Sequence, residues 1–155
     1  DKSVQENAEL YLRLLEFAKP YGVKVATENL YKWDNQLQKG VFASCATPES
    51  YLAHLNAVNH KDFVACLDIG HANSEVSNIP VETWVRRWAP RLGHVHIHNN
   101  EGGWDLHDHL DRGTIPMAET LKLLAELAPD ATWTLETLEA VPSCRWLAEQ
   151  GWIEE

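Results

Sequence analysis

The chain has 155 residues and a formal net charge of −10, from 23 acidic and 13 basic residues. This charge repels a polyanion, and no run of Lys or Arg marks a nucleic-acid groove, so we expect no nucleic-acid partner. No apolar stretch approaches the ~20 residues that cross a bilayer and no signal-peptide pattern is present, so we expect no membrane partner.

The three cysteines are an odd number and lack Cys-x-x-Cys spacing. They disfavour a disulfide framework and a thiolate zinc site, and they favour a reduced, cytoplasmic protein. Cys66 lies in an apolar run and is interpreted as a core residue. The length predicts one domain over residues 1–155, which is too short for a complete eight-stranded α/β barrel of roughly 250 residues. Because the chain begins at Asp1 and its only Met is Met117, we expect it to be part of a longer chain.

Helical and strand patterns alternate along the chain. Apolar residues at helical spacing predict a first helix over residues 4–21. Its apolar stripe consists of Leu10, Leu14, Phe17 and Tyr21. Gly22 ends this helix, and residues 23–28 predict a strand. The polar stretch 29–44 is long for a connection in a compact domain, which is typical of a functional loop.

The rest of the chain, from Thr47 onward, continues this alternation of helices and strands. Thr47 as N-cap and Pro48 at the first helical position predict a helix that runs to about Val58. The further predicted strands are 63–68, 92–98 and 131–136, and the further predicted helices are 79–90, 116–128 and 143–150. A loop rich in Gly, Asp and His spans residues 99–114. Strands that alternate with helices imply right-handed crossovers, so the sequence predicts an α/β fold of four parallel β/α units, half of a TIM barrel.

Four acidic or histidine residues each close one predicted strand. They are Glu28, Asp68, His96 and Glu136. The carboxyl ends of parallel barrel strands meet at one mouth, so we predict that these side chains converge on a metal ion. Three carboxylates and one imidazole offer a charge near −3, which suits a hard or borderline divalent ion. The excess negative charge also leaves a carboxylate basic enough to move a proton.

Histidines alternate along the third strand. His94, His96 and His98 share one face, and Val95 and Ile97 share the other. If Val95 and Ile97 pack under helices, all three histidines face the barrel axis. A lone histidine in a strand is more often a hydrogen-bonded core residue, but three in alternation beside strand-end carboxylates favour at least one metal ligand.

Loop residues near these strand ends are candidates for substrate binding. His71 follows Asp68 by three residues and either binds a second metal, bonds a substrate oxygen or is satisfied by the backbone. Asp105 and His107 form an acidic–histidine pair of metal-ligand type, a pattern that solvated loops also show. Trp104 follows two glycines and forms either an aromatic wall or part of a turn.

Five motifs, in this order, resemble the xylose isomerase-like TIM barrel superfamily. They are Glu28-Asn29, Asp68-x-Gly70-His71, His94-x-His96-x-His98-Asn99-Asn100, Asp105-x-His107-x-x-Leu110-x-x-Gly113-x-Ile115 and Leu135-Glu136. That superfamily includes sugar isomerases, ketose 3-epimerases, hydroxypyruvate isomerase, inosose dehydratase and apurinic endonucleases. The resemblance covers nearly the whole chain and implies strands five to eight, the C-terminal half of the family barrel.

The resemblance also implies roles for single residues. The family's shared metal ligands fall on Glu28, Asp68, His96 and Glu136. Its substrate-binding or second-metal histidine falls on His71, and its loop Asp-x-His falls on Asp105 and His107. The expected cofactor is one divalent ion, Mn²⁺ first, with Mg²⁺, Co²⁺ or Zn²⁺ as alternatives.

Three functional hypotheses follow. The preferred one is a metal-dependent sugar isomerase or epimerase that acts on a small sugar or hydroxy-carbonyl substrate through an enediolate, which the ion stabilises. Glu28 and Glu136 are its predicted catalytic acid and base. The first alternative is a zinc-dependent apurinic endonuclease-like phosphodiesterase. The second is an inactive half-barrel that pairs with a second copy to cover its open sheet edges.

Overall fold

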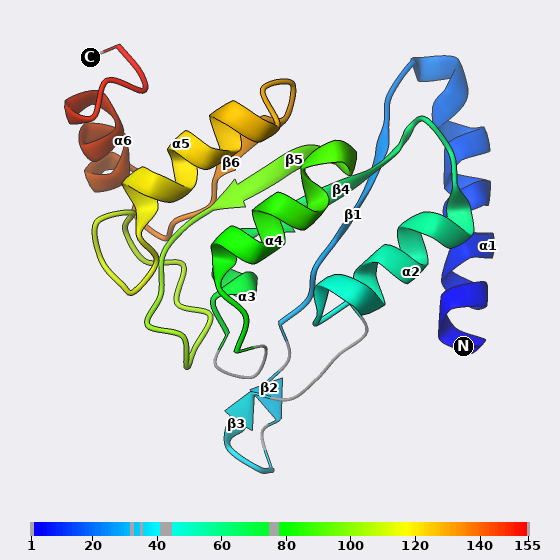
Figure 1. The fold of residues 1–155 in the computed structure, drawn as a ribbon, viewed down its shortest axis with the longest axis horizontal. Coiled ribbons are helices and arrows are strands. Elements are labelled where there is room, and N and C mark those ends of the chain that lie inside the picture. The colour runs from blue at the N-terminus through cyan, green and yellow to red at the C-terminus, as the bar shows by residue number, and fades with distance from the viewer. Residues whose placement is uncertain (1, 32, 35, 41–44, 75–77, 155) are drawn as a thin grey trace.

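The computed structural model describes residues 2–31, 33–34, 36–40, 45–74 and 78–154 (Figure 1). The strands are β1 (Val25–Glu28), β2 (Trp33–Asp34), β3 (Lys39–Gly40), β4 (Phe63–Asp68), β5 (Leu92–Ile97) and β6 (Thr132–Leu135). The α-helices are α1 (Lys2–Ala18), α2 (Pro48–Val58), α3 (Ile69–Ala72), α4 (Val81–Trp88), α5 (Met117–Leu127) and α6 (Ala140–Glu149). Two 3₁₀ turns, η1 (Lys19–Tyr21) and η2 (Ala89–Arg91), follow α1 and α4.

The main sheet has four strands in the order β1-β4-β5-β6, and every neighbouring pair is parallel. A helical connection separates each strand from the next, and α2, α4 and α5 lie along one face of the sheet (Figure 1). Parallel strands joined in this way confirm the predicted succession of β/α units. Their carboxyl ends all point toward the same edge of the sheet.

The first helix confirms its predicted place but packs with a different face. The predicted stripe is exposed, with Phe17 72% and Tyr21 69% exposed. The buried face instead carries Ala8, Leu15 and Ala18. Both stripes have helical spacing, and the spacing alone does not distinguish the one that faces the sheet. The smaller residues allow α1 to lie close to β1 and α2.

The polar stretch 29–44 contains more structure than a loop. Its described residues include the short antiparallel pair of β2 and β3, while residues 32, 35 and 41–44 lie outside the described part. Thr47 caps α2 as predicted, since its hydroxyl accepts a hydrogen bond from the Ser50 amide and the Ser50 side chain bonds the Thr47 amide. The last helix begins at Ala140, three residues before the predicted start, and accommodates Pro142 in its first turn.

The hydrophobic core lies between the sheet and its helices. Val95 and Ile97 are 0% and 3% exposed and belong to this core, which meets the condition for the histidines of β5 to face the other side. Leu121 and Leu124 of α5 are fully buried, whereas Leu127 at the end of the same stripe is only partly buried. Among the described residues, no helix combines the length and the apolar character needed to cross a bilayer.

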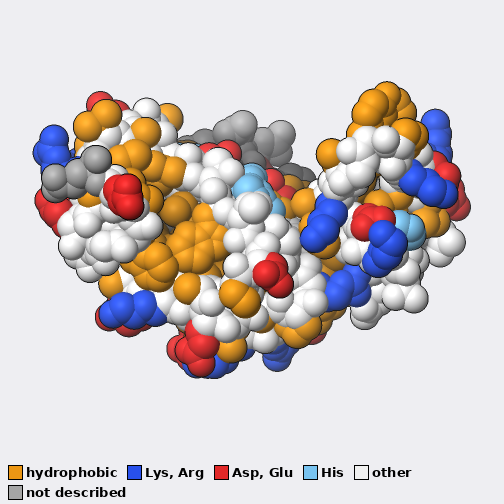
Figure 2. All heavy atoms as spheres, turned by 90° about the horizontal axis from the view of Figure 1, so that it is seen from above, with side chains coloured by type: hydrophobic (Ala, Val, Ile, Leu, Met, Phe, Trp, Pro, Cys, Tyr) orange, Lys and Arg blue, Asp and Glu red, His pale blue; other side chains and the backbone are white. Residues whose placement is uncertain are grey.

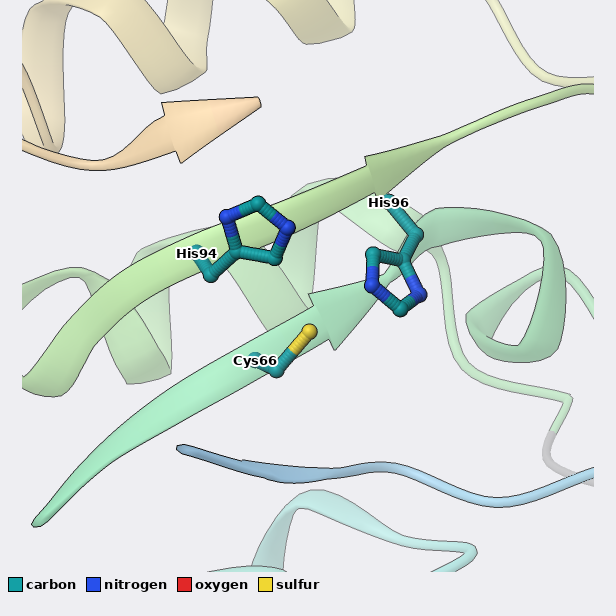
Figure 3. Close-up of side chains that lie close together, drawn as sticks. All are labelled: Cys66, His94 and His96. Carbon is teal, nitrogen blue, oxygen red and sulfur yellow. The ribbon is translucent and has the colours of Figure 1, made fainter. Parts of the chain in front are cut away.

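The opposite face of the sheet is open. Ala26, Thr132 and Thr134 are exposed there, and His94 and His96 project from β5 on the same side as Cys66 of β4 (Figure 3). Cys66 itself is buried, with 4% of its surface exposed. Figure 2 shows that the surface is hollowed between the α6 end and the α1 end, with histidine near its middle. The sheet therefore presents polar and ionisable side chains to a space that the described residues leave uncovered.

Gly70 in α3 permits a close approach between the β4 and β5 ends. A Cβ atom at this position would lie 1.9 Å from Cε1 of His98, so a Gly70→Ala variant must displace the buried imidazole. We expect it to destabilise the protein by about 1–3 kcal/mol through overpacking, measured by thermal or urea unfolding. Gly103→Ala is the matched control, because no atom lies within 4 Å of its added Cβ. Equal stability of the two variants would contradict this packing.

Candidate metal centre

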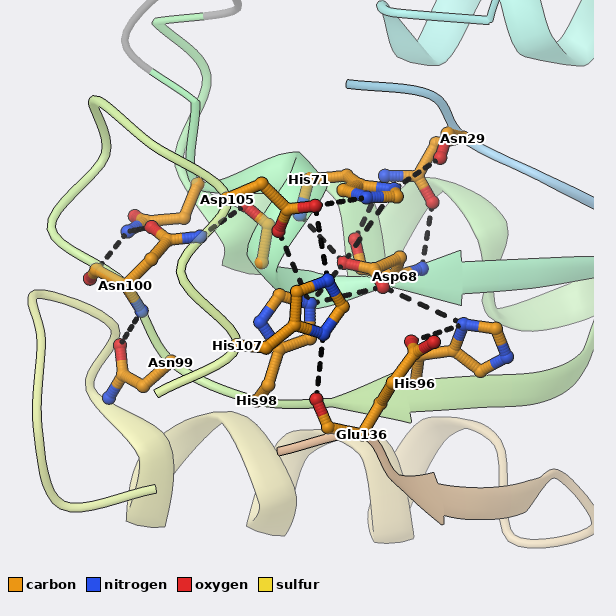
Figure 4. A network of polar contacts seen from close by, with 12 residues as sticks. Asn29, Asp68, His71, His96, His98, Asn99, Asn100, Asp105, His107 and Glu136 are labelled. Atoms are coloured by element: carbon orange, nitrogen blue, oxygen red, sulfur yellow. Dashed lines mark hydrogen bonds and ion pairs between the residues drawn. The ribbon is translucent and has the colours of Figure 1, made fainter. Parts of the chain in front are cut away.

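Three of the four predicted metal ligands, Asp68, His96 and Glu136, lie together at the carboxyl edge of the sheet (Figure 4). The fourth, Glu28, places Oε1 3.6 Å from Nδ1 of His96. Glu28 ends β1, and Asp68 ends β4 in register with His96 of β5. Glu136 follows β6, and its amide donates a hydrogen bond to the Ile97 carbonyl at 3.1 Å. The parallel register therefore brings residues that are far apart in the sequence to one point.

His96 lies at the centre of this group. Its Nδ1 atom is 2.9 Å from Oε2 of Glu136 and 3.6 Å from both Oε1 of Glu28 and Oδ2 of Asp68. This nitrogen is buried and makes no hydrogen bond with any described residue. A buried imidazole nitrogen that faces three carboxylates without a hydrogen bond fits a site for a divalent cation.

The electrostatics of the group are those of a crowded anionic site. Contacts with Asp68, Cys66 and Glu28 raise the pKa of His96 to about 12. Burial alone would raise the pKa of Glu28, but contacts with His71 and His96 outweigh it and lower that pKa to about 2. Glu28 thus stays charged, and the nearby carboxylates keep a proton on His96. A divalent ion bound at this point would replace that proton as the compensating positive charge.

Asp68 is fixed more firmly than the other carboxylates. Its side chain is 0% exposed and accepts a hydrogen bond from the His71 amide at 2.7 Å, which caps α3. Nε2 of His98 lies 3.0 Å from its Oδ1. Burial alone would raise the pKa of Asp68, but contacts with His96 and His98 hold it well below its usual range. Asp68 is therefore an ionised anchor of the site, out of contact with solvent.

A second group lies beside the first and contains three of the predicted substrate-binding residues. Oδ2 of Asp105 is 3.1 Å from Nε2 of His71 and 3.1 Å from Nε2 of His107. Nδ1 of His71 is 2.9 Å from the Asn29 carbonyl and 3.2 Å from Oε1 of Glu28. Together, His71, Asp105 and His107 form a second set of side chains that could hold a metal ion.

The loop 99–114 is tied to the ends of the strands. His107 places Nδ1 2.7 Å from the Glu136 carbonyl, and its own carbonyl accepts a hydrogen bond from the Leu138 amide. Tyr31 donates from its hydroxyl to the Gly103 carbonyl at 2.6 Å. Trp104, the fourth predicted substrate-binding residue, lies on this loop and is 53% exposed. Its predicted role as an aromatic wall stays a prediction.

Two site residues were not assigned by the sequence reasoning. His98 is fully buried, reaches Asp68 and stacks on His107 with ring centroids 4.1 Å apart. The alternation of His94, His96 and His98 indicated that His98 shares their face. Its contacts with Asp68 and His107 depend on segments that are distant in the sequence. Asn29 donates to the Asp68 carbonyl and accepts from the Asp68 amide, both at 2.8 Å. It directly follows Glu28, and only the pairing of β1 with β4 shows that it joins the two strand ends.

Comparison with known proteins places this geometry in context. The family model described as "Xylose isomerase-like TIM barrel" matches residues 2–155. Uncharacterized protein MJ1311 of Methanocaldococcus jannaschii is 29% identical over 133 residues, which cover 86% of this chain and 43% of that protein.

Two solved structures resemble the chain closely in fold. One, described as a D-tagatose 3-epimerase-like protein, is 29% identical with a TM-score of 0.79, and the match covers 95% of this chain and 54% of that one. The other, an L-ribulose 3-epimerase, is 20% identical with a TM-score of 0.66, and the match covers 96% of this chain and 45% of that one. The chain thus spans about half the length of the proteins it matches.

Proposed function

Because the chain belongs to the xylose isomerase-like TIM barrel family, we propose that it carries the metal centre of a sugar isomerase or epimerase. Its four parallel β/α units correspond to part of the family barrel, and the proposed position within it is the C-terminal half. The observation that carries the proposal is the buried Nδ1 atom of His96, which lies within 3.6 Å of three carboxylates.

We propose Glu28, Asp68, His96 and Glu136 as ligands of one divalent ion, with Mn²⁺ as the first candidate. Carboxylate oxygens with one imidazole suit Mn²⁺ and Mg²⁺, and they also accept Co²⁺ or Zn²⁺. When bound, such an ion supplies Lewis-acid polarisation of a substrate carbonyl and stabilises negative charge on its oxygen.

We propose that Glu28 and Glu136 act as the acid and base that transfer protons to and from the substrate. Their side chains are 32% and 43% exposed, whereas that of Asp68 is 0% exposed. Glu28 ends β1 and Glu136 follows β6, and these are the two outer strands of the sheet. The two glutamates therefore approach the centre from opposite sides. One carboxylate would remove the proton beside the substrate carbonyl, and the other would return it. Return to the opposite face of the same carbon gives an epimer, and return to the neighbouring carbon gives an isomer.

The second group would bind the rest of the sugar. His71 and His107 are imidazoles that share the Asp105 carboxylate, and all three offer hydrogen bonds to hydroxyl groups. Trp104 would supply an apolar wall at the edge of the site. A ketose substrate is supported by the two similar solved structures, which are described as a D-tagatose 3-epimerase-like protein and an L-ribulose 3-epimerase.

The proposal predicts hydrogen exchange at the carbon next to a ketose carbonyl. With Mn²⁺ present in D₂O, we expect the purified protein to incorporate deuterium from solvent into D-tagatose or L-ribulose and to form a second stereoisomer, followed by NMR. Chelation should stop both changes, and added Mn²⁺ should restore them. A metal-loaded protein that exchanges no proton in a panel of ketoses and inositol ketones would contradict the proposed function.

The two alternatives receive less support from the comparisons. The structure does gather the seven residues expected of a zinc phosphodiesterase, which are Glu28, Asp68, His71, His96, Asp105, His107 and Glu136. The two solved structures compared above are nevertheless described as an epimerase and an epimerase-like protein, and the charge of −10 opposes a nucleic-acid substrate. Three zinc ions per chain with cleavage of abasic DNA would favour the phosphodiesterase. Light scattering would test self-association of a half-barrel.

A further inference from the structure

Another set of potential ligands, Cys66, His94 and His96, lies on the open face of the sheet and is distinct from the set of His71, Asp105 and His107. Cys66 of β4 stands in register opposite His94 of β5, and His96 follows two residues later on the same face. Their ligand atoms, the Cys66 sulfur and one nitrogen of each imidazole, all lie within 4.8 Å of one another (Figure 3). The two imidazoles meet edge to face, with ring centroids 5.2 Å apart and planes at 84°.

His94 is held in the manner of a metal-ligating histidine. Its Nδ1 is 2.7 Å from the Thr132 hydroxyl, and its Nε2 is 3.0 Å from the Thr134 hydroxyl. A neutral imidazole donates from one nitrogen and accepts at the other, so one threonine can orient the ring while the other nitrogen exchanges its hydroxyl partner for a metal ion. Both threonines are exposed, so an incoming ion could reach this position from the open side.

We propose that Cys66, His94 and His96 form a second metal site, selective for a thiophilic divalent ion such as Zn²⁺. One thiolate and two imidazoles are zinc ligands, and a three-residue set leaves a fourth position open for water or another small ligand. Zinc bonds of about 2.0–2.3 Å require ligand atoms roughly 3–4 Å apart, so the set closes by small side-chain movements. Mg²⁺ and Mn²⁺ prefer oxygen donors and would remain at the carboxylate centre.

The site goes beyond the proposed sugar chemistry, although the two sites share His96. Cys66 and His94 are not among the four proposed ligands of the carboxylate centre, and neither Glu28 nor Glu136 belongs to the set of Cys66, His94 and His96. Variants of one pair therefore leave the other intact. The absence of Cys-x-x-Cys spacing disfavoured a thiolate zinc site, and this proposal departs from that expectation. It uses one cysteine, whose histidine partners lie beside it only because β4 and β5 pair.

Titration with Co²⁺ tests this site directly, because a cobalt–thiolate bond gives a near-ultraviolet charge-transfer absorption and a carboxylate site does not. With reduced protein, we expect this absorption to develop, to be displaced by Zn²⁺ and to resist Mg²⁺. Cys66→Ser should abolish it, whereas Cys144→Ser, which changes an exposed cysteine on α6, should retain it. Thr132→Val should weaken Co²⁺ binding about 10- to 100-fold, as expected for loss of a residue that orients a ligand.

Further variants separate this proposal from the proposed function. Glu136→Gln should keep the absorption even if turnover is lost. A change in the far-ultraviolet circular dichroism of Cys66→Ser would show that this variant is misfolded. His94→Gln is then the test variant, and it should weaken the cobalt–thiolate absorption although Cys66 is still present. No absorption in the unaltered protein, an undiminished signal in folded Cys66→Ser, or loss of the signal in Cys144→Ser would each overturn the proposal.

Discussion

Replacing Glu136 with Gln is expected to lower turnover of a ketose substrate by about 10²–10⁴-fold, the usual contribution of a general acid or base. Gln keeps the size of the side chain but cannot carry a proton between carbons. The Glu136 side chain is 43% exposed and lies 2.9 Å from Nδ1 of His96, so the change removes a charge at the centre without leaving a cavity. The fold should therefore survive, as judged by circular dichroism and thermal unfolding.

The measurement must separate lost chemistry from lost metal, because Glu136 is also a proposed ligand. Turnover is measured over a range of Mn²⁺ concentrations, and bound metal is determined in parallel. A rate deficit that persists at saturating Mn²⁺ assigns a proton-transfer role to Glu136. Glu149→Gln, at an exposed position near the end of α6, is the matched control and should retain the original rate. Unchanged turnover in Glu136→Gln would remove the catalytic role.

Much of the centre was predictable because polar residues at strand ends obey a simple geometry. In a parallel sheet, the last residues of successive strands meet at one edge. The pairing of Asp68 with His96 shows this directly. Glu28 is the last residue of β1, and Glu136 directly follows β6. Alternation along β5 also placed Val95 and Ile97 on one face, and the structure buries both residues, which is the condition under which the histidines face the other side.

Other features depended on contacts between segments that are distant in the sequence. The exposed stripe of Phe17 and the buried stripe of Ala8 share the same helical period, and only packing against the sheet selects between them. His98 follows β5 directly, and its full burial results from contacts with Asp68 of β4 and with His107 of the loop 99–114. The opposition of Cys66 and His94 follows from the strand register, which includes an irregularity between Ala65 and Cys66. Local patterns do not specify such a shift.

Replacing Asp68 with Asn is expected to remove metal binding at the carboxylate centre and to destabilise the protein by about 3 kcal/mol, the scale for breaking a buried charge pair. Asp68 is 0% exposed and accepts the His71 amide at 2.7 Å, with Nε2 of His98 at 3.0 Å. An amide group would place a donor where the carboxylate now accepts hydrogen bonds. Metal content and urea unfolding with and without chelator measure the two effects separately. Asp130→Asn, on the exposed turn between α5 and β6, is the control.

The stabilisation by Asp68 is expected to depend on pH in a definite direction. Because the pKa of Asp68 in the folded protein lies below its ordinary value of 3.8, its stabilisation is complete above that pH and is lost as the pH falls below it. The stability difference between the unaltered chelated protein and Asp68→Asn should therefore be largest near neutral pH and should shrink under acid. A difference that grows toward low pH, or an Asn variant that keeps both its metal and its stability, would show that Asp68 is not the ionised anchor of the site.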